Sequence, residues 1–174
     1  MRINKLFIII VLASTIFMLS CSKDTDAKTN SKTNVYERGK PMSWGHEQTI
    51  YVFADSDIWK DAEYYIKYSL ERPFYTVQNE KLYEIKLGDM NALDQFYKYK
   101  NLLFLCDLSS DKPVAQSVKK MMNTEMKDYV NNRGVGLFAN HNHWANEQFV
   151  VFMIGTNTKE LTDFYKSNGN ELFY

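Results

Sequence analysis

The run Asn101-Leu102-Leu103-Phe104-Leu105-Cys106 contains five apolar residues in succession. A strand with one exposed face alternates apolar and polar residues, whereas a strand covered on both faces is apolar throughout. The run therefore predicts a central strand buried on both faces. Cys106 has no intrachain disulfide partner, because the only other cysteine, Cys21, belongs to the N-terminal motif described below. We expect Cys106 to be a buried and inert thiol.

Further strands are predicted on both sides of this run. Their apolar, β-branched and aromatic residues lie at 47–54, 82–87, 135–141 and 148–154, and the last two are expected to pair antiparallel. Helical spacing of apolar residues predicts a helix after Asp55 that stops at Pro73, a short helix capped by Asp89, one long helix from Asp111 to Gly134, and a last helix opened by the capping box Asn157–Glu160. The fold class is therefore α+β (mixed α/β), a single domain with an about five-stranded mixed sheet packed against three to four helices.

The N-terminus has the pattern of a bacterial lipoprotein signal peptide. Arg2 and Lys5 precede fourteen uncharged residues, Leu6 to Leu19, which is shorter than the ~20 residues that span a bilayer. The run closes in Met18-Leu19-Ser20-Cys21, where a small residue precedes the cysteine. We expect residues 1–20 to be removed and Cys21 to be lipidated with fatty-acyl chains such as palmitate. The alternatives are an uncleaved membrane helix or an ordinary secretory signal.

Residues 21–45 are expected to form a lipidated flexible tether, and residues 46–174 the globular domain. From Ser22 to Asn34 the only apolar residue is Ala27, so this stretch cannot contribute a core. Ser22–Asp26, rich in lysine and aspartate, is similar to the signal that sends lipoproteins to the outer face of the outer membrane. Any solvated tether has the same composition, so the surface and the periplasmic face both stay open.

The charge balance argues against nucleic-acid binding. The whole chain has 21 Lys and Arg and 21 Asp and Glu. Loss of residues 1–20 removes Arg2 and Lys5, which leaves 19 basic against 21 acidic residues and a formal charge of −2. A chain with this balance has no basic field that would attract a polyanion.

Three groups of residues could carry chemistry or binding. His141 and His143 are expected on one side of an extended segment, as in some zinc sites, although no third ligand is evident. Asp55 and Asp107 each follow an apolar strand, so they would share a crevice if those strands are adjacent and parallel; the simpler interpretation is a helix cap and a turn. Trp144 opens a strand and is interpreted as a structural anchor, with an exposed binding ring as the alternative.

Aromatic residues are abundant, with three Trp, twelve Tyr and eleven Phe. They cannot all be core, and exposed tyrosines would form a flat patch for glycan or protein contact. The candidates are Tyr64, Tyr75, Tyr83, Tyr97 and Tyr99.

Several short motifs together resemble a known family. The chain contains Gly39-Lys40-Pro41-Met42-Ser43-Trp44-Gly45, a strand ending at Asp55, and Trp144-Ala145-Asn146-Glu147-Gln148. These resemble the Lys-Pro-x-Ser-x-Gly and Trp-Ala-x-x-Gln motifs of an uncharacterised family of Bacteroidetes outer-membrane lipoproteins, known only as a domain of unknown function. Members usually continue past the last helix seen here, so the resemblance implies a domain 46–174 that is C-terminally short or truncated.

The sequence thus favours a membrane-anchored bacterial lipoprotein whose domain is a non-enzymatic binding or structural module of the envelope. Its expected partners are the outer membrane, through the lipid, and an envelope protein or glycan; no cofactor is expected. The alternative is a hydrolase or metal-dependent enzyme that uses Asp55 and Asp107, or His141 and His143.

Overall fold

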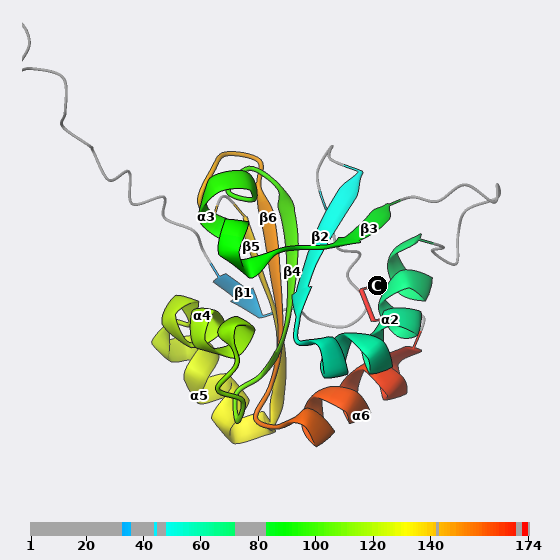
Figure 1. Ribbon diagram of the computed structural model, residues 1–174. Coiled ribbons are helices and arrows are strands. Elements are labelled where there is room, and N and C mark those ends of the chain that lie inside the picture. The colour runs from blue at the N-terminus through cyan, green and yellow to red at the C-terminus, as the bar shows by residue number, and fades with distance from the viewer. Residues whose placement is uncertain are drawn as a thin grey trace, which may run out of the picture.

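The computed structural model describes residues 33–35, 44, 48–71, 83–141, 143–169 and 172–173. Within these residues, six strands form one mixed sheet in the order β1-β5-β6-β4-β2-β3 (Figure 1). The strands are β1 (Thr33–Val35), β2 (Thr49–Ala54), β3 (Glu84–Leu87), β4 (Asn101–Asp107), β5 (Val135–His141) and β6 (Phe149–Gly155). Strands β3, β2, β4 and β6 are parallel, while β5 and β1 run antiparallel to their neighbours. The predicted α+β class with a mixed sheet is confirmed.

Strand β4 is the centre of the sheet, as its apolar run predicts. All seven of its residues are buried, between β2 on one side and β6 on the other. Its polar first residue, Asn101, is satisfied at both ends of the side chain: Nδ2 donates to the Trp44 carbonyl and Oδ1 accepts from the Phe149 amide at 3.2 Å. A buried polar group costs little when it is bonded in this way.

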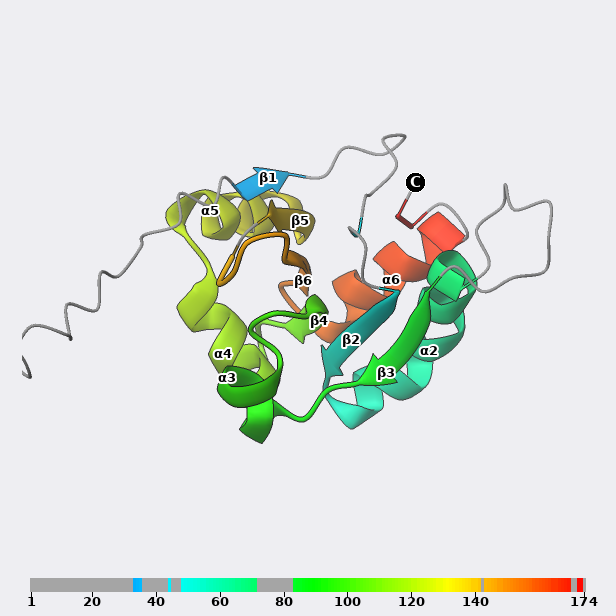
Figure 2. The same ribbon diagram turned by 90° about the horizontal axis from the view of Figure 1, so that it is seen from above.

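Two helical layers cover the two faces of the sheet (Figures 1 and 2). On one face, α2 (Ser56–Glu71) and α6 (Thr158–Asn168) pack together and cover Leu103 and Leu105 of β4. On the other face, α4 (Pro113–Met121) and α5 (Thr124–Arg133) cover Phe104 and Cys106. Alternate side chains of one continuous apolar strand therefore belong to two separate hydrophobic cores.

One helix differs from the sequence expectation. The single helix predicted between Asp111 and Gly134 is two helices, because Met122 is extended and Asn123 caps α5 by accepting from the Met126 amide at 2.8 Å. Asparagine side chains favour helix N-termini over helix interiors, which explains the break. The short helix expected after Asp89 is present: Asp89 caps the 3₁₀ turn η1 (Met90–Ala92), and α3 (Leu93–Phe96) follows it. The split of the long helix brings the described residues to five α-helices, against the three to four expected.

Strand β1 was also not anticipated. Thr33–Val35 lie in the segment that the sequence assigns to the tether, yet they pair with β5, Thr33 opposite Asn140 and Val35 opposite Phe138. The three residues carry too weak a pattern to be recognised as a strand, and the pairing comes from the open edge of β5.

Among the residues that the structure describes, no helix has the length and apolar character needed to cross a membrane. The predicted signal peptide, Cys21 and most of the tether lie outside these residues, as do Pro73 and Tyr75.

Candidate functional site

The first candidate site is the carboxyl edge of the sheet, where the parallel strands β2, β4 and β6 end. Asp55 follows β2 and Asp107 closes β4, and these strands are adjacent and parallel, which is the condition under which the two carboxyl groups approach. The chain leaves β2 toward the α2 face and leaves β4 toward the α4 face (Figure 1). In open α/β sheets, ligands bind in the crevice formed by such a divergence.

Asp107 is held by the protein's own donors. Its Oδ1 accepts from the backbone amide and the hydroxyl of Ser109, both at 2.7 Å, and its Oδ2 accepts from the Thr158 hydroxyl at 2.5 Å. Burial would raise the pKa of the Asp107 carboxyl, but these hydrogen bonds outweigh it and the pKa is lowered. Asp107 therefore closes the turn after β4 and ties it to the start of α6, as the simpler interpretation expected.

The pKa of the Asp55 carboxyl is shifted in the opposite direction from that of Asp107. Its Oδ2 receives a long hydrogen bond of 3.4 Å from the Ser110 hydroxyl. Burial raises the pKa of the Asp55 carboxyl, against the attraction of Lys112. Lys112 itself forms an ion pair with Asp57 at 2.7 Å. Consecutive serines of one turn thus contact the two carboxyl groups, and Asp55 is the one whose surroundings favour the protonated acid.

The two histidines do not form a common site. Each ring packs against an aromatic ring on a different face of the sheet: the His141 ring lies 4.4 Å from Phe149, on the α2 and α6 side, and the His143 ring lies 5.8 Å from Phe152, on the α4 and α5 side. The expectation that both imidazoles lie on one side is therefore wrong, because the chain bends after β5. Among the described residues, no group of three or more His, Cys, Asp or Glu side chains is placed to hold a metal ion.

His143 instead belongs to the turn that joins β5 and β6. Its Nδ1 lies 3.2 Å from the Asn140 Nδ2, and its ring packs against Trp144 with centroids 4.5 Å apart. Burial lowers the pKa of the His143 imidazole, which favours the neutral ring. The Oδ1 of Asn140 is buried and has no hydrogen-bond partner within the part of the chain that the structure describes.

Trp44 and Trp59 are buried, Trp44 the more deeply of the two, whereas Trp144 is only half-buried. Trp44 is 1% exposed and meets Phe149 and Phe173 edge-to-face, with ring centroids at 5.0 and 5.9 Å. Trp144 is half-buried against the α4 and α5 core, and its amide donates to Gln148 Oε1 at 2.9 Å. The sequence indicates Trp144 as the anchor because it stands between a polar loop and an apolar strand, whereas Trp44 lies in a segment rich in turn residues.

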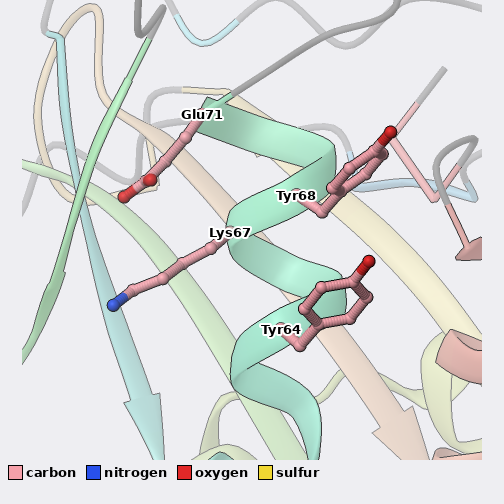
Figure 3. A pocket seen from close by; sticks show the side chains of 4 residues that line it. All are labelled: Tyr64, Lys67, Tyr68 and Glu71. Carbon is pink, nitrogen blue, oxygen red and sulfur yellow. The ribbon is translucent and has the colours of Figure 1, made fainter.

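The second candidate site is a shallow hollow on the outer surface of α2 (Figure 3). Tyr64 and Tyr68, one helical turn apart, form one ridge, and Lys67 and Glu71 form the neighbouring ridge; the hollow between them has a volume of about 210 Å³. Tyr64 is 68% exposed, and its ring centroid lies 5.9 Å from that of Tyr68. Of this pair only Tyr64 was expected to be exposed, although the i, i+4 spacing of Tyr64 and Tyr68 outside the apolar stripe of α2 is a signal for both.

The other tyrosine candidates differ in exposure, and Cys106 is buried as predicted. Tyr99 is 76% exposed, while Tyr83 and Tyr97 are half-buried against the two cores. Cys106 is 1% exposed, and burial, with the nearby Asp107 carboxylate, raises the pKa of its thiol to about 12. The predicted buried thiol is confirmed, and a thiolate nucleophile at this position is disfavoured.

These observations define a class of protein: a single α+β domain with a mixed, mainly parallel sheet between two helical layers. A family model described as a domain of unknown function (DUF8532) matches residues 43–174, and the chain belongs to that family. No curated protein and no solved structure matches the chain. Membership confirms the expected relationship to an uncharacterised family, whereas the Bacteroidetes and lipoprotein character of the resemblance stays a prediction.

Proposed function

We propose that this chain is a lipid-anchored protein of the bacterial outer membrane and that its domain is a non-enzymatic contact module. The anchoring part rests on the sequence, in which a fourteen-residue uncharged run ends in Met18-Leu19-Ser20-Cys21. The contact part rests on one structural observation, the tyrosine hollow of α2.

The chemistry of the hollow favours an envelope protein as the partner. Tyrosine presents a rigid apolar ring with a polar end, and it is enriched at protein interfaces for that reason. Beside the tyrosines, Lys67 is already paired with Glu63 at 2.6 Å, so the charged ridge is oriented before a partner arrives. The hollow, at about 210 Å³, is smaller than the ~300–1,000 Å³ of small-molecule sites and matches the insertion of one side chain of a larger partner.

Site-specific photo-crosslinking in living cells tests the contact role. The benzophenone amino acid is placed at position 64 of the full-length chain, and at position 60 as the matched control, because Lys60 is also exposed on α2 but does not line the hollow. A discrete adduct at position 64 that is absent at position 60 is the expected result. Equal adducts, or none at either position, would contradict the assignment.

The nature of the adduct separates the two kinds of partner. Digestion by a protease supports an envelope protein, whereas an adduct that resists proteases and shrinks under glycan-degrading enzymes would reassign the hollow to a glycan.

The second candidate function is a hydrolase or metal-dependent enzyme at Asp55 and Asp107, and the adjacent parallel strands favour it. We rank it lower because both oxygens of Asp107 already accept hydrogen bonds from the protein.

A further inference from the structure

The amino edge of the sheet, where the parallel strands β2, β4 and β6 begin, carries exposed aromatic side chains. Phe96, the last residue of α3, is 68% exposed, and Tyr99, two residues before β4, is 76% exposed. Lys98 between them is also exposed. In Figure 1, α3 and the β5–β6 turn lie at the same end of the molecule, opposite the start of α2 and α6.

The β5–β6 turn is bonded to this aromatic segment. Gln148 is buried, and its Nε2 donates to the carbonyls of Tyr97 at 3.3 Å and Lys100 at 3.1 Å. The same side chain accepts from the Trp144 amide through Oε1. The buried Gln148 amide therefore ties the main chain at Trp144 to the main chain on either side of Tyr99, so the aromatic residues of the two segments lie at one edge of the sheet.

The chain enters the domain at this same edge. Thr33, the first residue of β1, pairs with Asn140, one residue before the end of β5. Thr33 follows Cys21 by only twelve positions, a length that spans at most about 43 Å when fully extended and roughly 20 Å on average for a flexible chain. A seven-residue strand such as β4 is about 23 Å long, so the carboxyl edge is farther from the tether by that distance.

We propose that the amino edge is the membrane-facing end of the domain and that Phe96, Tyr99 and Trp144 rest in the interfacial layer of the bilayer. This inference rests on the lipid anchoring at Cys21 proposed above. Tyrosine and tryptophan rings, which have a polar end, prefer the headgroup level of a membrane, and an apolar ring such as that of Phe96 enters the boundary with the acyl chains. The tether keeps these rings within reach of the bilayer. The single base Lys98 stands beside two exposed acids, Asp94 and Glu147, so these charges give no positive patch for lipid headgroups and the rings carry the contact.

Quenching by brominated lipid tests this orientation in the full-length, acylated chain. A bimane fluorophore is attached to an introduced cysteine in Tyr99→Cys, in Phe96→Cys and, as control, in Asp111→Cys, since Asp111 is exposed near the carboxyl edge. The native thiols do not interfere, because Cys106 is buried and the proposed acylation blocks Cys21. Each protein is reconstituted in phosphatidylcholine vesicles with and without brominated acyl chains.

We expect quenching at positions 99 and 96 and none at position 111. If the protein sediments with the vesicles but position 99 is quenched no more than position 111, the orientation is wrong and the anchor stands. If Cys21 carries no acyl mass and the chain stays out of the vesicle fraction, the anchoring proposal fails and the orientation fails with it. Agreement between positions 96 and 99 guards against a local effect of one substitution.

Discussion

The most informative perturbation of the fold is Trp44→Ala. The Trp44 ring is 1% exposed and lies among Phe149, Phe173 and Tyr83, with centroid distances of 5.0, 5.9 and 6.4 Å. The ring therefore joins two segments of the chain that lie 129 positions apart, at Trp44 and Phe173. The hydrogen bond that the Asn101 side-chain amide donates to the Trp44 carbonyl does not involve the indole, so the substitution mainly removes packing.

The expected cost is large. A buried tryptophan removes ~150–250 Å² from water, which at ~25 cal/mol per Å² corresponds to about 4–6 kcal/mol before the part retained by alanine is subtracted. Measured Trp→Ala substitutions in cores cost ~3–5 kcal/mol. We therefore expect a loss of about 4 kcal/mol in the free energy of unfolding, a large share of the ~5–15 kcal/mol that stabilises a domain.

Urea and thermal unfolding of the mature chain carrying Cys21→Ser measure this cost. A loss of this size lowers the thermal midpoint of a domain of this length by about 12–16 °C. The matched control is Trp144→Ala, since Trp144 is only half-buried and should lose about 1–2 kcal/mol. A Trp144→Ala loss equal to or larger than that of Trp44→Ala would refute the assignment of Trp44 as the anchor and restore the expectation drawn from the sequence.

Three further predictions follow from Cys21, Cys106 and the two carboxyl groups. Mass spectrometry of the N-terminal peptide should show acyl chains on Cys21, and an unmodified Cys21 or retained residues 1–20 would contradict the anchor. A soluble maleimide should label Cys106 slowly in the native protein and rapidly in urea, because the thiol is buried and its pKa is raised to about 12; fast native labelling would contradict this. Asp55→Asn should raise the thermal midpoint at pH 7. The folded pKa of Asp55 is raised, so ionisation of the carboxyl group lowers the stability of the fold as the pH rises through that pKa, and asparagine cannot ionise. The gain should vanish below the ordinary aspartate pKa of 3.8, where the carboxyl group is protonated in both states. Asp107→Asn should lower the midpoint at pH 7, because its folded pKa is lowered, and the difference should shrink as the pH falls through the folded value; equal signs for the two variants would contradict their assigned environments.

The sequence predicted the elements whose signal is local. The apolar run of β4 indicated a strand buried on both faces because no residue in it can face water without cost, and its seven residues are buried. The cap at Asn157 was visible for a similar reason, since an asparagine side chain three residues before Glu160 bonds the Glu160 amide, here at 3.0 Å. The break at Asn123 carried the same kind of signal, but the apolar stripe running through it concealed two helices as one.

Only the tertiary structure decided the contacts between distant segments. Strand β6 lies between β4 and β5 through pairings such as Phe104 with Phe152, and local pattern does not encode which strands become neighbours. The same limit explains the two tryptophans, since the partners of Trp44 lie up to 129 positions away at Phe173, and nothing beside Trp44 in the chain reveals them. It also explains why His141 and His143 lie on different faces of the sheet, since the bend of the chain after β5 decides which face each ring packs against. Burial is a property of the assembled layers, so sequence alone named the residue types of this protein's candidate surfaces, and the packing of the sheet against its helices determined which of them meet.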